Sequence, residues 1–139
     1  MVSKRPQVLT SSLRRFLAAP RIARLCTQGP DGYPHVVPIY FMRHGDDIVF
    51  GSDRDEAKVR NALRNPRAAV VIGGDPGRDD AGYMIQGDLT VEPNPDRGLI
   101  RSLLLRYESR KEAEQFLAQW GPGEGVLLRL KPRKAIRVW

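Results

Sequence analysis

The sequence predicts a small antiparallel β-barrel with peripheral helices, built from six to seven strands. Short runs rich in β-branched and aromatic residues recur along the 139 residues, and glycine, proline or aspartate marks most of the turns between them. Segments with apolar residues at helical spacing lie between or beside these runs. A barrel closes its own sheet edges, which suits a chain with many short strands.

The first expected element is a short helix over residues 9–19. Leu13, Phe16 and Leu17 follow the i, i+3, i+4 spacing of one helix face. Pro20 ends the helix, because proline cannot continue the hydrogen-bond pattern. We therefore expect a peripheral helix before the first strand.

A β-hairpin is expected next, with strands over about 21–28 and 33–43. The Asp31-Gly32 step lies between the runs RIARLCTQ and YPHVVPIYFM. Glycine adopts a positive φ without steric cost, so an Asp-Gly step between two such runs is a strong hairpin signal. Pro38 inside the second run cannot donate to a sheet ladder, which implies either an edge strand or a bulge.

A third strand over about 47–52 leads directly into a helix over about 54–65. Asp53 and Glu56 have the spacing of a capping box, with aspartate in place of serine or threonine. Pro66 stops this helix. Its expected apolar stripe consists of Val59, Ala62 and Leu63.

Two more strands are expected over 67–74 and about 82–92, on either side of a polar loop. Gly87 inside the second of them indicates a bulge or a close backbone approach. At the C-terminus, the runs GVLLRLKP and RKAIRVW are expected to form two strands, or one bent strand broken at Pro132.

Between these strands, two helices are expected over about 95–107 and 110–120. The first carries Leu99, Leu103 and Tyr107 among its apolar positions. The expected inward face of the second consists of Ala113, Phe116, Leu117 and Trp120.

Length and composition indicate one domain over residues 1–139, large enough to fold without disulfides. The single cysteine, Cys26, rules out an internal disulfide and fits the reducing cytoplasm; we expect it in the core. No apolar run approaches the roughly 20 residues of a membrane span, and the N-terminus lacks the apolar segment of a signal peptide. The net charge of +7 favours anionic partners, but acidic residues interleave with the basic ones, so neither nucleic acid nor membrane is expected as a partner.

The step from the third strand into its helix is a candidate anion site. A strand that feeds a helix N-terminus presents free backbone N–H groups, and Ser52, Arg54 and Lys58 add a hydroxyl and two cations. Phosphate is the anion that suits such a site best. Ser52 either donates to the phosphate or caps the helix, and Lys58 either binds the anion or is a solvated helix lysine. Asn61 lies three residues after Lys58 and extends the same polar face.

Four motifs follow one another in order along the chain: RIARLCT, DGYPHVVPIYF, FGSDRDEAKVRNALRNPRAAVVI and YMIQGDLTV. In this order they resemble the flavin-binding split-barrel family, the fold of pyridoxamine-phosphate-oxidase-like proteins. The first two motifs are typical of the branch that depends on the deazaflavin coenzyme F-420. The resemblance implies a homodimer with the cofactor, either FMN or coenzyme F-420, in a groove between two barrels.

The resemblance also implies roles for particular residues. Lys58 matches the family's phosphate-binding lysine, and the run 37–39 matches the strand that lines the ring. Gln86 lies on the strand that meets the ring edge in relatives, and Thr27 lies at the end of the first strand. The expected cofactor-binding residues are Lys58, Ser52, Arg54, Asn61, Val37, Pro38, Ile39, Thr27 and Gln86.

The function expected from the resemblance is that of a flavin-type oxidoreductase, with hydride transferred to or from a small conjugated organic substrate. In such enzymes the cofactor carries the chemistry, so no side chain has to act as an acid or base, and no catalytic residue is assigned. The chain is shorter than pyridoxamine-phosphate oxidases and lacks their long C-terminal segment, so that particular oxidation is not expected. The alternatives are a cofactor-binding protein without turnover and a small basic nucleic-acid-binding barrel.

A histidine and a pair of aspartates are also candidate functional residues. His35, the only histidine inside a predicted strand, either contacts the ring or substrate or is a surface residue. The Asp79-Asp80 pair lies in a loop without a neighbouring histidine, so no metal site is expected.

Overall fold

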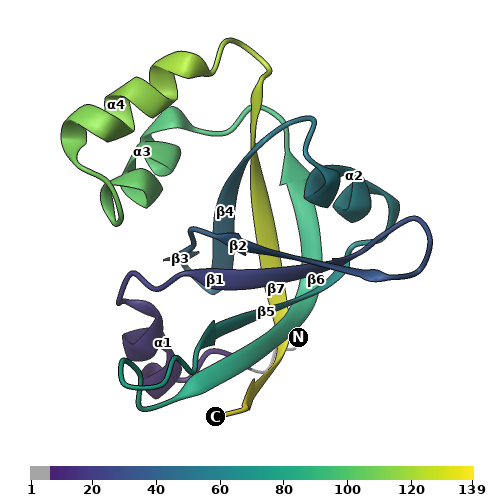
Figure 1. Ribbon diagram of the computed structural model, residues 1–139, viewed down its shortest axis with the longest axis vertical. Helices are drawn as coiled ribbons and strands as arrows, with labels where there is room; N and C mark the ends of the chain where they lie inside the picture. The colour runs from purple at the N-terminus through teal and green to yellow at the C-terminus, as the bar shows by residue number, and fades with distance from the viewer. Residues whose placement is uncertain (1–6) are drawn as a thin grey trace, which may run out of the picture.

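Residues 7–139 form a seven-stranded sheet and four helices in the computed structural model (Figure 1). Residues 1–6, which belong to the stretch where no signal peptide is expected, lie outside the described part. The strands are β1 (Ala23–Gln28), β2 (Pro34–Ile39), β3 (Met42–His44), β4 (Asp47–Asp53), β5 (Arg67–Gly73), β6 (Gly82–Glu92) and β7 (Gly125–Arg137). The helices are α1 (Ser11–Leu17), α2 (Ala57–Arg64), α3 (Arg97–Leu105) and α4 (Arg110–Gln119). Within residues 7–139, no helix has the length and apolar character that a membrane crossing needs.

The predicted split-barrel fold is confirmed, but the sheet does not close. The strand order is β2-β1-β5-β6-β7-β4-β3, and all neighbours are antiparallel. In the described part of the chain, the edge strands β2 and β3 each pair with one strand only, so the expectation that a barrel closes its own edges is wrong. The sheet instead curls so that β1 and β2 cross in front of β4 in Figure 1, and the end of β2 approaches β4 without a ladder between them.

The stretch 33–43, predicted as one strand, forms the two opposite edge strands β2 and β3. The break falls at Tyr40 and Phe41. Phe41 is fully buried, and its backbone N–H donates to the Tyr107 hydroxyl at 3.2 Å. That hydroxyl in turn donates to the carbonyl oxygen of Arg21 at 2.8 Å. Because Tyr107 satisfies the Phe41 N–H, the chain can leave one sheet edge here and join the other without a lost hydrogen bond.

Two apolar clusters lie on the two faces of β4. Ile48 and Phe50 belong to the cluster inside the curl of the sheet, whereas Val49 belongs to the cluster under α3 and α4. Successive strand residues point to opposite faces, so a strand covered on both sides reads as a continuous apolar run such as IVF. The α3–α4 hairpin therefore packs on the outer face of β4 (Figure 1).

β6 and β7 form a long ladder that contains the irregularity predicted at Gly87. The register skips one residue of β7 between the pairs Gln86–Lys134 and Gly87–Pro132. A Cβ on Gly87 would lie 2.1 Å from the carbonyl oxygen of Lys131. The predicted bulge and the predicted close approach are both confirmed. β7 runs through Pro132 as a single strand, because the proline falls at the bulge, where a missing N–H is tolerated.

α2 begins later than predicted. Its N-cap is Glu56, which makes no side-chain capping bond, so the expected capping box with Asp53 is wrong. Asp53 stays in β4, where its carboxylate accepts the indole N–H of Trp120 at 2.5 Å. Leu63, expected in the apolar stripe of this helix, is 71% exposed. The packing face of α2 is thus narrower than the predicted stripe.

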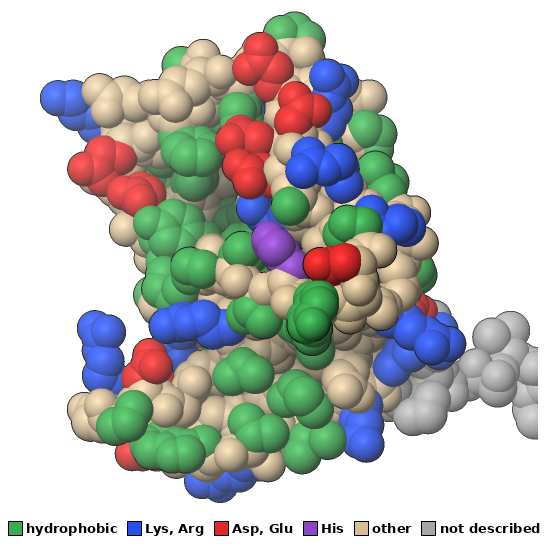
Figure 2. All heavy atoms as spheres, turned by 45° about the vertical axis from the view of Figure 1, so that its right-hand side comes forward, with side chains coloured by type: hydrophobic (Ala, Val, Ile, Leu, Met, Phe, Trp, Pro, Cys, Tyr) green, Lys and Arg blue, Asp and Glu red, His purple; other side chains and the backbone are tan. Residues whose placement is uncertain are grey.

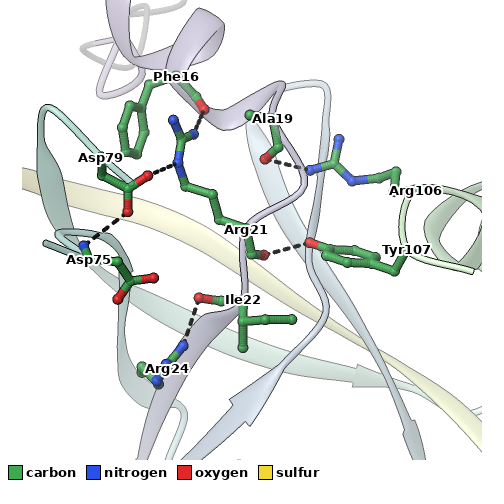
Figure 3. Close-up of polar contacts among 9 residues, drawn as sticks. All are labelled: Phe16, Ala19, Arg21, Ile22, Arg24, Asp75, Asp79, Arg106 and Tyr107. Atoms are coloured by element: carbon green, nitrogen blue, oxygen red, sulfur yellow. Dashed lines mark hydrogen bonds and ion pairs between the residues drawn. The ribbon is translucent and has the colours of Figure 1, made fainter. Parts of the chain in front are cut away.

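The loop between α3 and α4 fastens the helical hairpin to the start of the sheet (Figure 3). Arg106 donates to the carbonyl oxygen of Ala19 at 3.3 Å, just after α1. Arg21 lies 3.8 Å from the centroid of the Phe16 ring and donates to Asp79 at 2.8 Å. This bond from the Arg21 guanidinium holds the pKa of Asp79 below its usual value. The bonds from Arg106 to Ala19 and from Tyr107 to Arg21 hold the hairpin in position relative to β1.

Candidate functional site

The end of β2 and the middle of β4 border an apolar pocket of about 250 Å³, which we call the helical-hairpin pocket. β2 contributes Pro38 and Ile39, Tyr40 follows directly, and β4 contributes Gly51. Figure 2 shows hydrophobic side chains in a hollow between the upper helical part and the sheet below it. The other lining residues come from the α3–α4 hairpin: Ile100, Leu103, Leu104, Phe116 and Trp120.

The run 37–39, predicted to line a ring, lies on an edge strand. The pairing of β2 with β1 is unbroken, so Pro38 marks an edge and not a bulge. Val37 and Ile39 are half-buried and pack against the core, whereas Pro38 is exposed on the other face. Proline has no N–H, so its place on a free edge costs no ladder hydrogen bond. The free edge of β2 therefore borders the pocket at Pro38 and Ile39.

Ser52, Arg54 and Lys58 follow one another from β4 into α2, but they differ in access. Ser52 is 5% exposed, and its hydroxyl donates to the carbonyl oxygen of Asp53 at 2.9 Å, so it does not cap the helix. Arg54 is exposed, and its ion pair with Asp55 is long, at 3.9 Å. Lys58 is half-buried, and no hydrogen bond or ion pair involves it in residues 7–139. Of the three, the two cations are available to an anion.

Thr27 and Asn61 form a buried polar pair between β1 and α2. Their exposed fractions are 2% and 3%, and the Asn61 amide donates to the Thr27 hydroxyl at 3.1 Å. Arg64 donates to the Asn61 side-chain oxygen at 2.8 Å. Because these atoms already have partners, we expect the pair to hold α2, and with it Lys58, against the sheet. Their predicted contact with a cofactor stays a prediction.

Gln86 lies apart from the helical-hairpin pocket, in a hollow of about 590 Å³ on the outer face of the sheet, which we call the outer groove. Arg67, Arg133 and Lys134 give this groove a basic lining, and Arg133 is paired with Asp88 at 2.6 Å. No local sequence pattern predicts that these three cations lie together, because Arg67 belongs to β5 and Arg133 and Lys134 belong to β7. Cys26, expected in the core, is half-buried and also lines the groove.

His35 has a buried, unsatisfied nitrogen. The residue pairs with Thr27 across β1 and β2, and its Nδ1 atom has no hydrogen-bond partner in the described residues. Buried polar atoms without partners are uncommon, and an imidazole nitrogen can donate or accept. His35 is half-buried and therefore not a plain surface residue, and its contact with a ring or substrate stays a prediction. His44 ends β3, with its Nδ1 atom 3.1 Å from the Arg129 guanidinium.

Tyr40 is a pocket residue that sequence reasoning missed. Its ring stacks on Tyr107, with centroids 4.0 Å apart and planes 2° from parallel. Its hydroxyl donates to Glu108 at 2.6 Å. This hydrogen bond, together with burial, raises the pKa of Tyr40 to about 12, and the same bond lowers the pKa of Glu108. The two bonded residues are 68 positions apart, so no local pattern relates them.

We expect this pair to make the protein lose stability between about pH 10 and pH 12. An unfolded tyrosine releases its proton near pH 10, whereas folded Tyr40 retains it until about pH 12. The unfolded state then binds fewer protons than the folded state, so the free energy of unfolding falls as the pH rises. Tyr40→Phe should show a shallower fall in urea titrations at pH 9, 10 and 11. Parallel falls for the two proteins would contradict the bond.

The residues around the helical-hairpin pocket suit an organic ligand. Among residues 7–139, no three histidine, cysteine, aspartate or glutamate side chains gather in a way that could hold a metal ion. The free edge of β2 borders the helical-hairpin pocket, whereas His35 and Lys58 lie outside the lining of that pocket. A free strand edge and an ammonium group match a flat ring that carries an anionic chain.

Comparisons with known proteins agree on the fold. The sequence profile of the family described as Pyridoxamine 5'-phosphate oxidase matches residues 9–138. An F420 reductase superposes with a TM-score of 0.71 at 23% identity, covering 88% of this chain and 94% of that chain. A conserved hypothetical protein from Mycobacterium tuberculosis gives 0.74 at 21% identity, covering 98% and 89%. General Stress Protein 26 from Bacillus anthracis gives 0.65 at 18% identity, covering 88% of each chain. None of the curated proteins matches the sequence.

Proposed function

The chain belongs to the pyridoxamine 5'-phosphate oxidase family, and on this premise we propose that it is a flavin-type oxidoreductase. It binds coenzyme F-420 or FMN and transfers hydride to or from a small conjugated organic substrate. The observation that carries this proposal is the step from β4 into α2. An apolar pocket opens at Gly51, and the unpaired, half-buried Lys58 follows seven positions later.

Each end of such a cofactor has a counterpart in the proposed site. The ring would lie beside the helical-hairpin pocket, along the free edge of β2 at Pro38 and Ile39, where backbone groups can bond its polar rim. The phosphate lies at Lys58, with Arg54 as a second, exposed cation. The fold likeness to an F420 reductase, with a TM-score of 0.71, supports the class of cofactor.

The residues of the chain bind, orient and shield. When bound, the cofactor supplies or accepts a hydride, which carries one proton and two electrons. The apolar walls of the helical-hairpin pocket exclude water from the reacting atoms. The rigid attachment of the α3–α4 hairpin through Tyr107 keeps these walls in place.

We further propose a homodimer that forms through the outer face of the sheet. Ile22, Val36 and Val71 are 38%, 58% and 37% exposed on this face, and Figure 2 shows hydrophobic side chains gathered in its lower half. Exposed apolar patches of this kind mark interaction surfaces. The outer groove with Gln86 lies on the same face, so a partner subunit would close over it.

Val71→Glu is expected to produce monomers. The carboxylate would lose its water on entering the apolar patch that the proposed interface buries, which opposes association. Size-exclusion chromatography with light scattering should give about twice the 15.6 kDa chain mass for the wild type and 15.6 kDa for the variant. Leu63→Glu is the matched control, because Leu63 is an exposed apolar residue of α2 and does not belong to the sheet, and it should remain dimeric. A monomeric wild type at micromolar concentration would contradict the proposed homodimer.

The cofactor is tested by thermal melting with coenzyme F-420 and, separately, with FMN. A ligand at 100 times its dissociation constant stabilises the folded state by roughly 2.7 kcal/mol, so the true cofactor should raise the midpoint. Single-stranded DNA at the same concentration should leave the midpoint unchanged. A shift with DNA and none with either cofactor would replace this function by nucleic-acid binding.

A further inference from the structure

The helical-hairpin pocket has the chemistry of a site for an uncharged, flat ring compound, and we propose that it binds the substrate of the oxidoreductase. The word substrate rests on the proposed function. The binding itself does not, because the pocket is complete within one chain and is tested without a cofactor.

The walls of the pocket combine aromatic and aliphatic side chains. Tyr40, Phe116 and Trp120 supply the aromatic rings, and the last two meet edge to face with centroids 5.4 Å apart. Phe116 is 43% exposed, so an apolar ring is kept at the opening of the pocket. A volume of about 250 Å³ is below the range of drug-sized sites, which indicates one small ligand with one or two rings.

The charges in and around the pocket disfavour an anionic ligand. None of the nine lining residues is charged. The polar tips of two of them are bound to carboxylates: the Tyr40 hydroxyl to Glu108 at 2.6 Å, and the Trp120 indole N–H to Asp53 at 2.5 Å. An anion that entered would lose its water without gaining a cation, and two carboxylates would lie nearby. The pocket therefore selects neutral compounds.

Gly51 keeps the pocket open. Its φ is not in the left-handed region, so its backbone does not require glycine. A Cβ at this position would point at the lining, 3.6 Å from Trp120 Cη2 and 3.7 Å from Ile100 Cδ1 and Leu103 Cδ2. Glycine weakens a strand interior, and the space it leaves for a ligand accounts for its presence in β4.

The test uses two probes of the same shape, 2-acetylnaphthalene and 2-naphthoate, which differ in one methyl group against one charged oxygen. Binding is followed by the indole N–H signals in a nitrogen–proton correlation spectrum. The chain has two tryptophans, so Trp120 reports on the pocket and Trp139, which does not line it, is the internal control. We expect the ketone to shift the Trp120 signal saturably and the carboxylate to bind at least about tenfold more weakly.

Variants of pocket residues test whether the ketone binds in the helical-hairpin pocket. Gly51→Val fills the space and should weaken the ketone at least about tenfold, whereas Leu63→Ala on exposed α2 should leave it unchanged. If Gly51→Val does not fold, Phe116→Ala serves instead, because its exposed ring can be removed without a buried cavity. Asp53→Asn combined with Glu108→Gln should strengthen binding of the carboxylate.

Two results would overturn the assignment: equal binding of both probes, or unchanged ketone binding in Gly51→Val and Phe116→Ala. The outcome is separable from that of the proposed function. No ketone binding together with a cofactor-dependent rise in melting midpoint would remove only the substrate site. Ketone binding at Trp120 without any cofactor effect would remove only the oxidoreductase.

Discussion

Gly87→Ala is expected to lower the free energy of unfolding by about 1–3 kcal/mol. The added Cβ would lie 2.1 Å from the carbonyl oxygen of Lys131 and 2.8 Å from its carbonyl carbon. Both are backbone atoms of the paired strand, so the clash can be relieved only if β6 and β7 move apart at the bulge. Urea unfolding followed by tryptophan fluorescence measures the change.

Gly51→Ala is the matched control for this effect. It also lies in a strand and outside the left-handed φ region, but its Cβ would meet side-chain atoms at 3.6 Å and 3.7 Å, an ordinary contact distance. Alanine at such a position commonly stabilises a protein by about 0.4–1 kcal/mol. If Gly87→Ala unfolded at the same urea concentration as the wild type, the close approach of β6 to β7 would not exist in solution.

Lys58→Ala is expected to weaken cofactor binding by roughly ten- to a hundredfold without unfolding the protein. A charge-assisted hydrogen bond to phosphate contributes about 1.5–3 kcal/mol, which corresponds to that change in affinity. The fold should persist, because Val59, Asn61 and Ala62 are the buried residues of α2 and alanine is a better helix former than lysine. Titration of the wild type and the variant with the cofactor that raises the melting midpoint measures the loss.

Two further variants make the Lys58 result specific. Lys58→Arg should recover part of the affinity, because it restores the charge with a different donor geometry. Lys111→Ala removes a cation from the exposed side of α4 and should change little. Equal affinity in wild type and Lys58→Ala would mean that Lys58 is a solvated helix lysine and that the phosphate lies elsewhere.

The candidate site was only partly accessible from the sequence. For Pro38, the sequence predicted either an edge strand or a bulge, because proline lacks an N–H, and the structure shows the edge. Lys58 has no hydrogen bond or ion pair within residues 7–139, and its role in an anion site stays a prediction. Ser52 and Asn61, in contrast, are polar residues whose burial no local pattern reveals. A polar side chain in the sequence is equally consistent with ligand binding and with an internal hydrogen bond.

By itself, the sequence determined the order and type of the elements except for the break of 33–43 into β2 and β3, together with the Asp31-Gly32 hairpin turn and the irregularity at Gly87. Each of these depends on φ preferences, proline chemistry or apolar spacing within a few neighbouring residues. Only the tertiary structure decided that the sheet stays open and that Tyr40, Gly51 and Trp120 share one pocket. Asp53 shows the reason: a local capping pattern lost to a hydrogen bond from an indole 67 residues away. Such bonds form when packing brings distant surfaces together, and apolar spacing specifies which face of an element is buried but not which distant surface covers it.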